Sequence, residues 1–355
     1  MTIKVLLVED SKISLVILRR ILNEFPQMEV VGEAPNGLEA LRLIPKVQPD
    51  VICTDLHMPQ MDGLEFTTEV MSHYPKPILV LSVSVQHEDT HHIFDVLEAG
   101  AVDICPKPIA GLTMGNQAFN RELINKIIVL SGVRVFKKKP KPLVKPKPIN
   151  LQDLTFAPAT SYPKPKIIAI GTSTGGPPAL QEILSQLPAN FSVPIICVQH
   201  ICQGFLQGLI DWLSATCKLP IKIAQSGYKP QPGIIYFPPE QHHLELNNQG
   251  DFVCSDKPAL DGHRPSVTVT FESVAKVYGK KSTAILLTGM GRDGAKGMLA
   301  IAQAGGLTIA QDEATSIIFG MPKEAIDLGA AREVLPLGAI APMLLELLQK
   351  QSIVQ

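Results

Sequence analysis

The chain has 355 residues, more than one ordinary hydrophobic core accommodates, so we expect two domains. Hydrophobic residues make up 45% and charged residues 18%, with a net charge of −1, which is typical of a globular protein and excludes binding to nucleic acid through overall positive charge. We expect no signal peptide and no membrane insertion, because the apolar start is short and no apolar run reaches roughly 20 residues, and the six scattered cysteines favour a reducing cytoplasm.

Short apolar runs alternate with amphipathic stretches over the first 130 residues. The stretches SLVILRRILNEF and GLEALRLIPKV have the apolar spacing of helices. The apolar runs predict five strands: IKVLLV, MEVVGE, VICTD, PILVLS and VDIC. This alternation predicts a doubly wound parallel sheet with helices on both faces.

A basic, proline-rich segment follows this first half. Six lysines and four prolines lie between Lys137 and Pro148, and proline at this density continues neither a helix nor a central strand. We expect an extended, semi-rigid linker. The alternative is a basic tail that contacts nucleic acid, but no aromatic residue is interleaved with the lysines, which favours the linker.

The alternation of strands and helices resumes after the linker. KIIAI, PIICVQ and STAILLT have the pattern of parallel strands, each followed by a glycine-rich or polar loop and a helix. Between Gly233 and Cys254, the closely spaced runs GIIYFPP, HHLELNN and DFVCS, with a turn signal at NNQG, predict an insert of antiparallel hairpins. The second half is therefore expected to be another α/β sheet with an antiparallel portion.

Polar side chains follow the strands of the first predicted sheet. Glu9 and Asp10 come after the first strand, and Asp55, Ser82 and Lys107 come at the ends of the third, fourth and fifth. Ligands bind at this edge of open parallel sheets, and gathered carboxylates repel one another unless a hard cation such as Mg²⁺ lies between them. A carboxylate beside Mg²⁺ can attack a phosphoryl group while an ammonium and a hydroxyl neutralise the transferred oxygens. Ordinary polar strand ends are the alternative, but five such residues at matching positions favour a site.

With the motifs VLLVEDS, TDLHMPQMDGLEF and PKP, the first 130 residues resemble a response-regulator receiver domain. The resemblance implies a flavodoxin-like fold in which Asp55 accepts phosphate from a histidine kinase. It also implies that Mg²⁺ is held by Glu9, Asp10, Asp55 and the main-chain carbonyl of His57.

The switch residues of the receiver family correspond to Ser82 and Lys107, and the resemblance implies a cis peptide bond between Lys107 and Pro108. Three residues before the lysine the family usually has phenylalanine or tyrosine, where this chain has Ile104. Since that aromatic residue normally couples phosphorylation to the signalling surface, we expect the switch to run differently here while phosphorylation itself persists.

The second candidate site is centred on Ser173, in the stretch IGTSTGGPPAL that fits the nucleophile pattern GxSxG. Two nucleotide-binding interpretations compete with a nucleophilic serine. A phosphate loop needs lysine and then serine or threonine where Pro177 and Pro178 stand, and a dinucleotide fingerprint needs glycine at Ser173. The two prolines are instead suited to open a helix, whose N-terminus favours a developing oxyanion.

A nucleophilic serine needs a base within hydrogen-bond reach and a carboxylate behind that base. His200 ends the strand PIICVQ and Asp293 follows STAILLT, so both are expected at the same edge of the sheet as Ser173. The order serine, histidine, aspartate differs from that of α/β-hydrolases, which excludes their fold. The remaining histidines fit less well, because they lie in the hairpin insert or in a loop: His242, His243 and His263.

Glycines stand on both sides of Met290 and permit a close approach of the backbone. We therefore expect the Met290 amide to be one donor of an oxyanion hole.

Five separated motifs in this half are similar to the catalytic domain of chemotaxis protein-glutamate methylesterases, over about residues 165–347: IGTSTGGPPAL, VQH, DGHRPSV, LLTGMGRDGAKGM and IAQDEATSIIFGMPKEAI. The resemblance implies a Rossmann-like esterase domain with Ser173 as nucleophile, His200 as base and Asp293 orienting the histidine. Two further residues match family positions that line the site: Thr174 and Arg264.

The whole chain then has the architecture of that family, with a receiver domain at 1–131, a Lys/Pro-rich linker at 132–164 and a catalytic domain at 165–350. The resemblance implies a phosphorylation-activated esterase that releases methanol from glutamate methyl esters and deamidates glutamines on chemoreceptors. No cofactor is expected in the esterase step. The expected partners are methyl-accepting chemoreceptors and a chemotaxis histidine kinase, and the protein is expected to be a cytoplasmic monomer.

Two other functions stay open from the residues. One is an esterase or amidase with the same three residues and a different acyl substrate. The other is a non-enzymatic binding module under the control of the receiver domain, which the serine, histidine and aspartate together disfavour.

Overall fold

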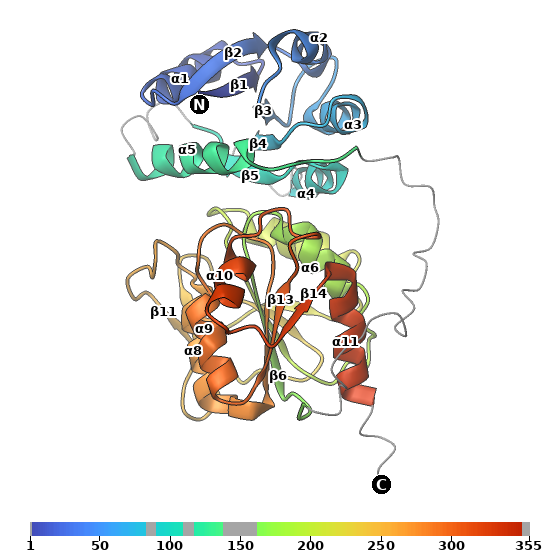
Figure 1. The fold of residues 1–355 in the computed structure, drawn as a ribbon, viewed down its shortest axis with the longest axis vertical. Coiled ribbons are helices and arrows are strands. Elements are labelled where there is room, and N and C mark those ends of the chain that lie inside the picture. The colour runs from blue at the N-terminus through green and yellow to red at the C-terminus, as the bar shows by residue number, and fades with distance from the viewer. Residues whose placement is uncertain (1, 83–89, 109–116, 138–161, 350–355) are drawn as a thin grey trace. The chain divides into compact units, whose positions relative to one another are not determined.

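The computed structural model describes residues 2–82, 90–108, 117–137 and 162–349, and the chain divides into two compact units, Met1–Lys145 and Pro146–Gln355 (Figure 1). Most of the predicted linker, residues 138–161, lies outside the described residues. The predicted boundaries at 131 and 165 therefore stay predictions.

The first unit contains a five-stranded sheet in the order β2-β1-β3-β4-β5, in which all neighbouring strands are parallel. This is the strand order of flavodoxin-like folds, so the predicted fold of this half is confirmed. The five strands lie close to the predicted runs: β1 (Ile3–Val8), β2 (Met28–Ala34), β3 (Val51–Asp55), β4 (Ile78–Ser82) and β5 (Asp103–Pro106).

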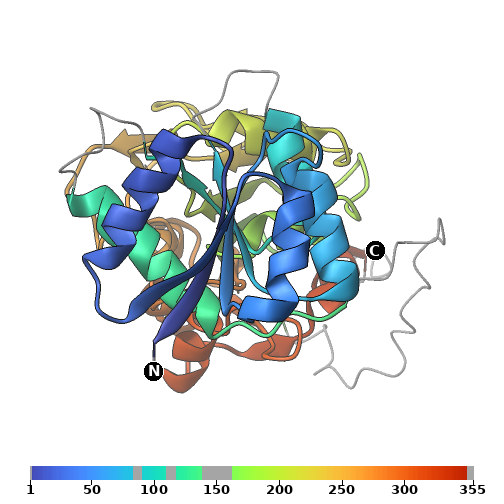
Figure 2. The same cartoon turned by 90° about the horizontal axis from the view of Figure 1, so that it is seen from above.

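Helices cover both faces of this sheet (Figure 2). Helices α1 and α5 share one hydrophobic core, to which Leu22 and Ile127 contribute fully buried side chains. Their amphipathic spacing explains why each buries one face and leaves the other in solvent. The helices are α1 (Lys12–Asn23) and α5 (Gln117–Ser131) on one face, and α2 (Gly37–Val47), α3 (Gly63–His73) and α4 (Thr90–Ala99) on the other.

The second unit contains a seven-stranded parallel sheet in the order β14-β13-β12-β6-β7-β9-β8. The chain runs outward from β6 in one direction and then returns to the other side of β6 at β12, as in Rossmann-like folds, so this prediction is also confirmed. The strands are β6 (Ile167–Thr172), β7 (Ile195–Gln199), β8 (Ile221–Ile223), β9 (Ile235–Phe237), β12 (Ser282–Leu286), β13 (Leu307–Gln311) and β14 (Glu333–Leu335).

Six α-helices in the described part of this unit cover the sheet. Helices α8, α9 and α10 share a core with the sheet, in which Val267, Phe271 and Met298 are fully buried, and α6 packs against α11 (Figure 1). The helices are α6 (Gly176–Leu184), α7 (Leu206–Ser214), α8 (Val267–Tyr278), α9 (Ala295–Gln303), α10 (Met321–Asp327) and α11 (Leu337–Gln349). No helix in the described ranges has both the length and the apolarity needed to cross a membrane.

The predicted antiparallel insert is smaller than expected. Strands β10 (His243–Leu246) and β11 (Phe252–Ser255) form the predicted hairpin. The run GIIYFPP was wrongly assigned to it, because β9 pairs in parallel with both β7 and β8 of the main sheet. All three residues of β9 are buried, as in a parallel strand covered on both faces. The run was assigned to the insert because it lies close to the hairpin along the chain, and this closeness says nothing about which strands it pairs with.

Both sheets have one place where chain connections leave in opposite directions, and ligands bind there in open α/β sheets. In the first unit this place lies between β1 and β3. In the second unit it lies between β6 and β12. The predicted site residues Asp55 and Ser173 follow or end strands at these two places.

Candidate active site and phosphoacceptor site

Ser173 lies in the turn between β6 and α6. The Gly176 amide donates a hydrogen bond to the Ser173 carbonyl (2.8 Å), which makes the turn tight. Pro177 and Pro178 follow in the first turn of α6, as the sequence predicts, because proline needs no amide donor there. The serine therefore lies just ahead of a helix N-terminus, where partial positive charge favours an oxyanion.

A buried glutamine holds the serine and the histidine together. Gln199, which ends β7 and is 4% exposed, donates from Nε2 to the main-chain carbonyls of both Ser173 and His200, at 2.8 Å each. The His200 amide donates to the carbonyl of Thr172 (3.0 Å). Gln199 was not among the residues predicted from the sequence, although a polar side chain at the end of an apolar strand was a signal for it.

Asp293 is the most strongly held side chain of the site. Its carboxylate is 1% exposed and lies at the N-terminus of α8, where helix donors and the helix dipole stabilise negative charge. Five donors contact its two oxygens: His200 Nε2 (2.9 Å), the Val267 amide (2.7 Å), Ser266 Oγ (2.8 Å), the Thr268 amide (3.0 Å) and the Gly294 amide (2.9 Å). Burial alone would raise the pKa of Asp293, but the hydrogen bonds from His200 and Thr268 hold it well below its usual range. The carboxylate is therefore ionised.

The contact with Asp293 decides which nitrogen of His200 can act as a base. An ionised carboxylate only accepts hydrogen bonds, so Nε2 carries the proton and Nδ1 keeps its lone pair. Nδ1 is buried and has no hydrogen-bond partner in the described residues. The contact with the aspartate is thus made by the other nitrogen than in the usual serine protease triad, in which Nδ1 faces the aspartate.

The loop after β12 passes beside the serine. The Ser173 amide donates to the carbonyl of Thr288 (3.1 Å), the residue before Gly289 in this loop. Within the described ranges, the Met290 amide donates to no protein acceptor, and the residue is 40% exposed. The amide is thus available to an oxyanion, as the prediction for Met290 requires.

We expect Gly289→Ala to disturb the nucleophile directly. A Cβ atom at Gly289 would lie 2.8 Å from the Ser173 Cβ and would overlap the Met321 sulfur, so the loop or the serine must shift. A shift of this kind in a packed site costs about 1–3 kcal/mol of stability. Because misplacing a reacting atom by about 1 Å can cost about 100-fold in rate, kcat for ester hydrolysis should fall by roughly 10- to 100-fold. Steady-state kinetics beside Gly132→Ala would check this, because Gly132 is exposed and its added carbon would lie at an ordinary contact distance of 3.5 Å from the Val129 carbonyl oxygen; equal losses in both variants would contradict it.

The other predicted site residues of the second unit are placed less centrally. Thr174 is buried, and its carbonyl accepts a hydrogen bond from Thr288 Oγ1 (3.1 Å). Arg264 lines a pocket together with Gln199, but its guanidinium donates to the carbonyl of Asp256 (2.8 Å) in its own loop. His263, which the sequence analysis set aside, stacks on the ring of His200.

In the first unit, the predicted acidic residues do meet at the edge of the sheet. Glu9, Asp10 and Asp55 each place a carboxylate oxygen within 4.8 Å of the others, with Glu9 and Asp55 buried and Asp10 exposed. Lys107 Nζ donates to Asp55 Oδ2 (2.7 Å) and to Glu9 Oε1 (3.0 Å). Ser82, the last residue of β4, is buried, and its carbonyl accepts from the Lys107 amide (2.8 Å).

The donor set of this cluster fits a hard divalent cation. Three carboxylates face a single ammonium, so negative charge is left over. Burial raises the pKa of Glu9, and the nearby charge of Asp55 raises it further. Burial alone would lower the pKa of Lys107, but the hydrogen bonds of its ammonium to Asp55 and Glu9 outweigh this effect and raise the pKa. Glu9 Oε2 forms an ion pair with Lys107 Nζ (2.9 Å). Within the described residues, however, it accepts no hydrogen bond of good geometry. An additional cation would stabilise this oxygen.

One expectation for this unit is wrong. Within the described residues the only cis peptide bond joins Arg264 to Pro265, so the Lys107–Pro108 bond is trans. Trans is the isomer that bonds to proline favour by about 0.5–1 kcal/mol, and Lys107 reaches both carboxylates with it. Ile104, which replaces the usual aromatic residue, is 6% exposed in β5.

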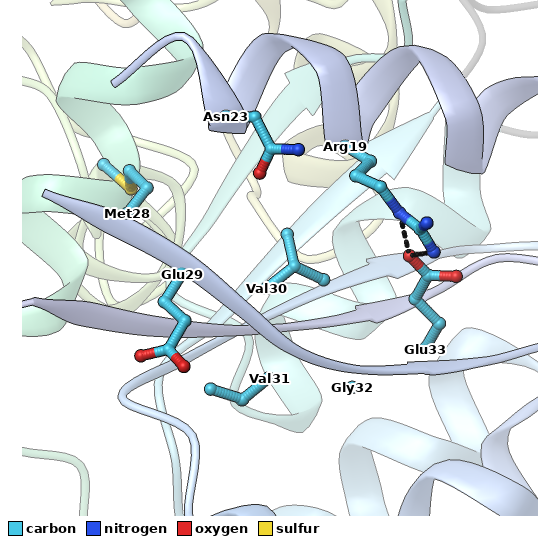
Figure 3. Close-up of a pocket in the computed structure, with 8 residues that line it drawn as sticks. All are labelled: Arg19, Asn23, Met28, Glu29, Val30, Val31, Gly32 and Glu33. Atoms are coloured by element: carbon cyan, nitrogen blue, oxygen red, sulfur yellow. Dashed lines mark hydrogen bonds and ion pairs between the residues drawn. The ribbon is translucent and has the colours of Figure 1, made fainter. Parts of the chain in front are cut away.

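A surface pocket elsewhere in the first unit contains none of the predicted site residues. Figure 3 shows it between α1 and the edge strand β2, with an ion pair between Arg19 and Glu33 at its rim. It is separate from the acidic cluster, which is formed by residues at the ends of other strands.

Comparisons with known proteins agree with this architecture. Residues 168–344 match the CheB methylesterase family, and residues 5–116 match the response regulator receiver domain. A protein-glutamate methylesterase/protein-glutamine glutaminase of Nitrosospira multiformis is 38% identical over 99% of this chain and 98% of its own length. Another, from Pseudomonas aeruginosa, is 40% identical over 98% of this chain and 97% of its own.

Among solved structures, the crystal structure of the Thermotoga maritima CheB methylesterase catalytic domain is 41% identical, with a TM-score of 0.50, and covers 52% of this chain and 99% of that one. The relatives extend over nearly the whole chain, and the two matched regions coincide with the two parallel sheets. The chain therefore belongs to the family of protein-glutamate methylesterases/protein-glutamine glutaminases, with a receiver domain followed by a CheB methylesterase domain.

Proposed function

We propose that this chain is a phosphorylation-activated serine esterase, which hydrolyses glutamate methyl esters and deamidates glutamines on chemoreceptors. The observation that carries this proposal is the juxtaposition of Ser173, His200 and an ionised Asp293 at the switch point of the second sheet. The names of relatives that match nearly the full length supply the substrate class.

In the first chemical step, His200 acts as the base through Nδ1. Ser173 Oγ attacks the γ-carbonyl carbon of the methylated glutamate, and His200 Nδ1 takes the hydroxyl proton. Asp293 stabilises the imidazolium that forms through its contact with Nε2 (2.9 Å). The Met290 amide donates to the oxyanion of the tetrahedral intermediate.

The remaining steps release the products and regenerate the free Ser173 hydroxyl. His200 gives its proton to the departing methoxide, which leaves as methanol, and a glutamyl ester of Ser173 remains. Water then attacks this ester while His200 Nδ1 takes a proton from it. His200 passes that proton to Ser173 Oγ as the ester bond breaks, and the receptor leaves with a free glutamate carboxylate on its side chain. With glutamine as substrate the leaving group is ammonia, and the same residues act.

The receiver domain controls this activity through Asp55. We propose that a chemotaxis histidine kinase is the phosphodonor and that Glu9, Asp10, Asp55 and the His57 carbonyl hold Mg²⁺. The cation supplies charge neutralisation for the transferred phosphoryl group. Lys107, already paired with Asp55, and the Ser82 hydroxyl then contact the phosphoryl oxygens as switch residues. The protein acts in the cytoplasm.

The experiment that tests the proposed function is methanol release from membranes carrying methylated chemoreceptors. We expect release by the full chain, a rise when a small-molecule phosphodonor and Mg²⁺ are added, and ammonia release from receptors carrying glutamine at the same positions. Hydrolysis of small esters without any release from receptors would instead identify an esterase with another acyl substrate.

Asp55→Asn is expected to abolish the response to the phosphodonor while basal methanol release stays within about twofold of wild type. The reason is that an amide is no phosphoryl acceptor, whereas Asp55 belongs to the acidic cluster of the first unit and the proposed triad residues belong to the second unit. The measurement is the ratio of initial rates with and without the phosphodonor, with Asp50→Asn as control, since Asp50 lies at the start of β3, away from the cluster. A response that survives in Asp55→Asn would contradict this assignment.

A further inference from the structure

A second histidine covers one face of the proposed catalytic base. The rings of His200 and His263 lie parallel, with an interplanar angle of 3° and ring centroids 3.8 Å apart. Both edges of His200 have other roles, because Nε2 contacts Asp293 and Nδ1 is the atom proposed to accept the serine proton. Only the faces of the ring remain for a further interaction, and His263 occupies one of them.

The backbone around His263 forms a tight turn that presents its ring. Asp261 and Gly262 have φ angles of 50° and 86°, the positive values that a type I′ turn requires at both central positions. Two hydrogen bonds between Leu260 and His263 close the turn, at 2.9 and 3.1 Å. The sequence Asp-Gly is favoured for this geometry, so the turn is locally encoded.

The turn is also fixed to the segment that carries the aspartate. Arg292, the residue before Asp293, contacts the Asp261 carboxylate with Nε (3.2 Å) and Nη2 (3.1 Å). The start of the loop is held by His243 of β10, whose ring donates from Nε2 to the carbonyl of Pro258 (3.1 Å). The same ring accepts at Nδ1 from the amide of Ser266, the N-cap of α8 (3.2 Å). The loop is thus tied to both the Asp293 segment and the N-cap of α8.

The parallel stack places the His200 ring over the π face of His263, with the ring centroids 3.8 Å apart. The geometry becomes favourable when one ring is positively charged and lies over the π face of the other. His200 acquires this charge when it takes the serine proton. The stack therefore stabilises the charged base more than the neutral base, which is the condition for faster chemistry.

We propose that His263 is a positioning residue, which fixes the ring plane of His200 and stabilises its imidazolium form through its π face. The inference rests on the proposed function for the role of His200, but it needs no receptor to be tested. His263 belongs neither to the proposed triad of Ser173, His200 and Asp293 nor to the loop that carries the Met290 amide.

The experiment compares His263→Ala, His263→Leu and His263→Phe in the full chain. A fluorophosphonate probe reports the nucleophilicity of Ser173 without any receptor, and methanol release gives kcat and KM. We expect His263→Ala and His263→Leu to lower both the labelling rate and kcat by about 5- to 30-fold with KM nearly unchanged, because the π face is lost. His263→Phe, which keeps a flat ring, should recover most of the labelling rate.

His242→Ala is the matched control, because His242 is also a half-buried loop histidine, and its ring donates from Nδ1 to the carbonyl of Glu240 (2.8 Å), a neighbour in its own loop. Thermal melting of each variant separates loss of folding from loss of reactivity. Full labelling of His263→Leu would overturn the proposal, as would a phenylalanine variant that melts like wild type and labels as slowly as alanine. Normal labelling with no methanol release by wild type would instead count against the proposed substrate alone.

Discussion

Ser173→Ala is expected to lower kcat for methanol release by on the order of 10⁴–10⁶-fold, because it removes the proposed nucleophile from a set of residues that act as a unit. The fold should tolerate the change. In the part of the chain that the structure describes, the hydrogen bonds of Ser173 are made by its amide and its carbonyl, to Thr288, Gly176 and Gln199, and none involves Oγ. The measurement is the rate of methanol release at saturating receptor, together with a thermal melt.

The control for this variant is Ser214→Ala, the same substitution at an exposed position that ends α7 in the same unit. It should leave both the rate and the melting temperature unchanged. Substantial release by a folded Ser173→Ala protein would show that another group attacks the ester.

Asp293→Asn is expected to lower kcat by about 10³–10⁴-fold, because an asparagine amide can donate to His200 Nε2 and so force the proton onto Nδ1. The ring would then present a donor to the serine where a base is needed. Stability should fall too, since an amide nitrogen at the Oδ2 position would face the Val267 amide, and a buried donor without an acceptor costs about 1–3 kcal/mol.

The stability difference should depend on pH. The pKa of Asp293 is depressed in the folded state, so its contribution is present above the unfolded pKa of about 3.9 and is lost as pH falls through the folded value. The melting temperatures of wild type and Asp293→Asn should differ at pH 7 and converge in strong acid. The control is Asp211→Asn, which changes a carboxylate on α7 that accepts a hydrogen bond from the Gln207 side chain. Equal activity of Asp293→Asn and wild type would contradict the assigned role.

The receiver half followed from its sequence almost completely. Parallel strands place their carboxyl ends at one edge of a sheet, so polar residues that follow successive apolar runs meet there whatever the loops do. Glu9, Asp10, Asp55 and Lys107 were predicted on this basis, and the structure brings them together. The isomer of the Lys107–Pro108 bond was predicted wrongly, because the two isomers differ by only about 0.5–1 kcal/mol and local sequence does not decide between them.

In the second half, the sequence by itself determined the class of sheet, the helix opened by Pro177 and Pro178, and the strand ends that carry Ser173 and His200. These features depend on periodicity and on local backbone preferences, which neighbouring residues encode. Only the tertiary structure decided that β9 joins the main sheet, that His200 Nε2 faces Asp293, and that His263 covers the His200 ring. His200 and Asp293 are 93 positions apart, and ring orientation is set by hydrogen bonds and packing between such distant segments, which no local pattern records.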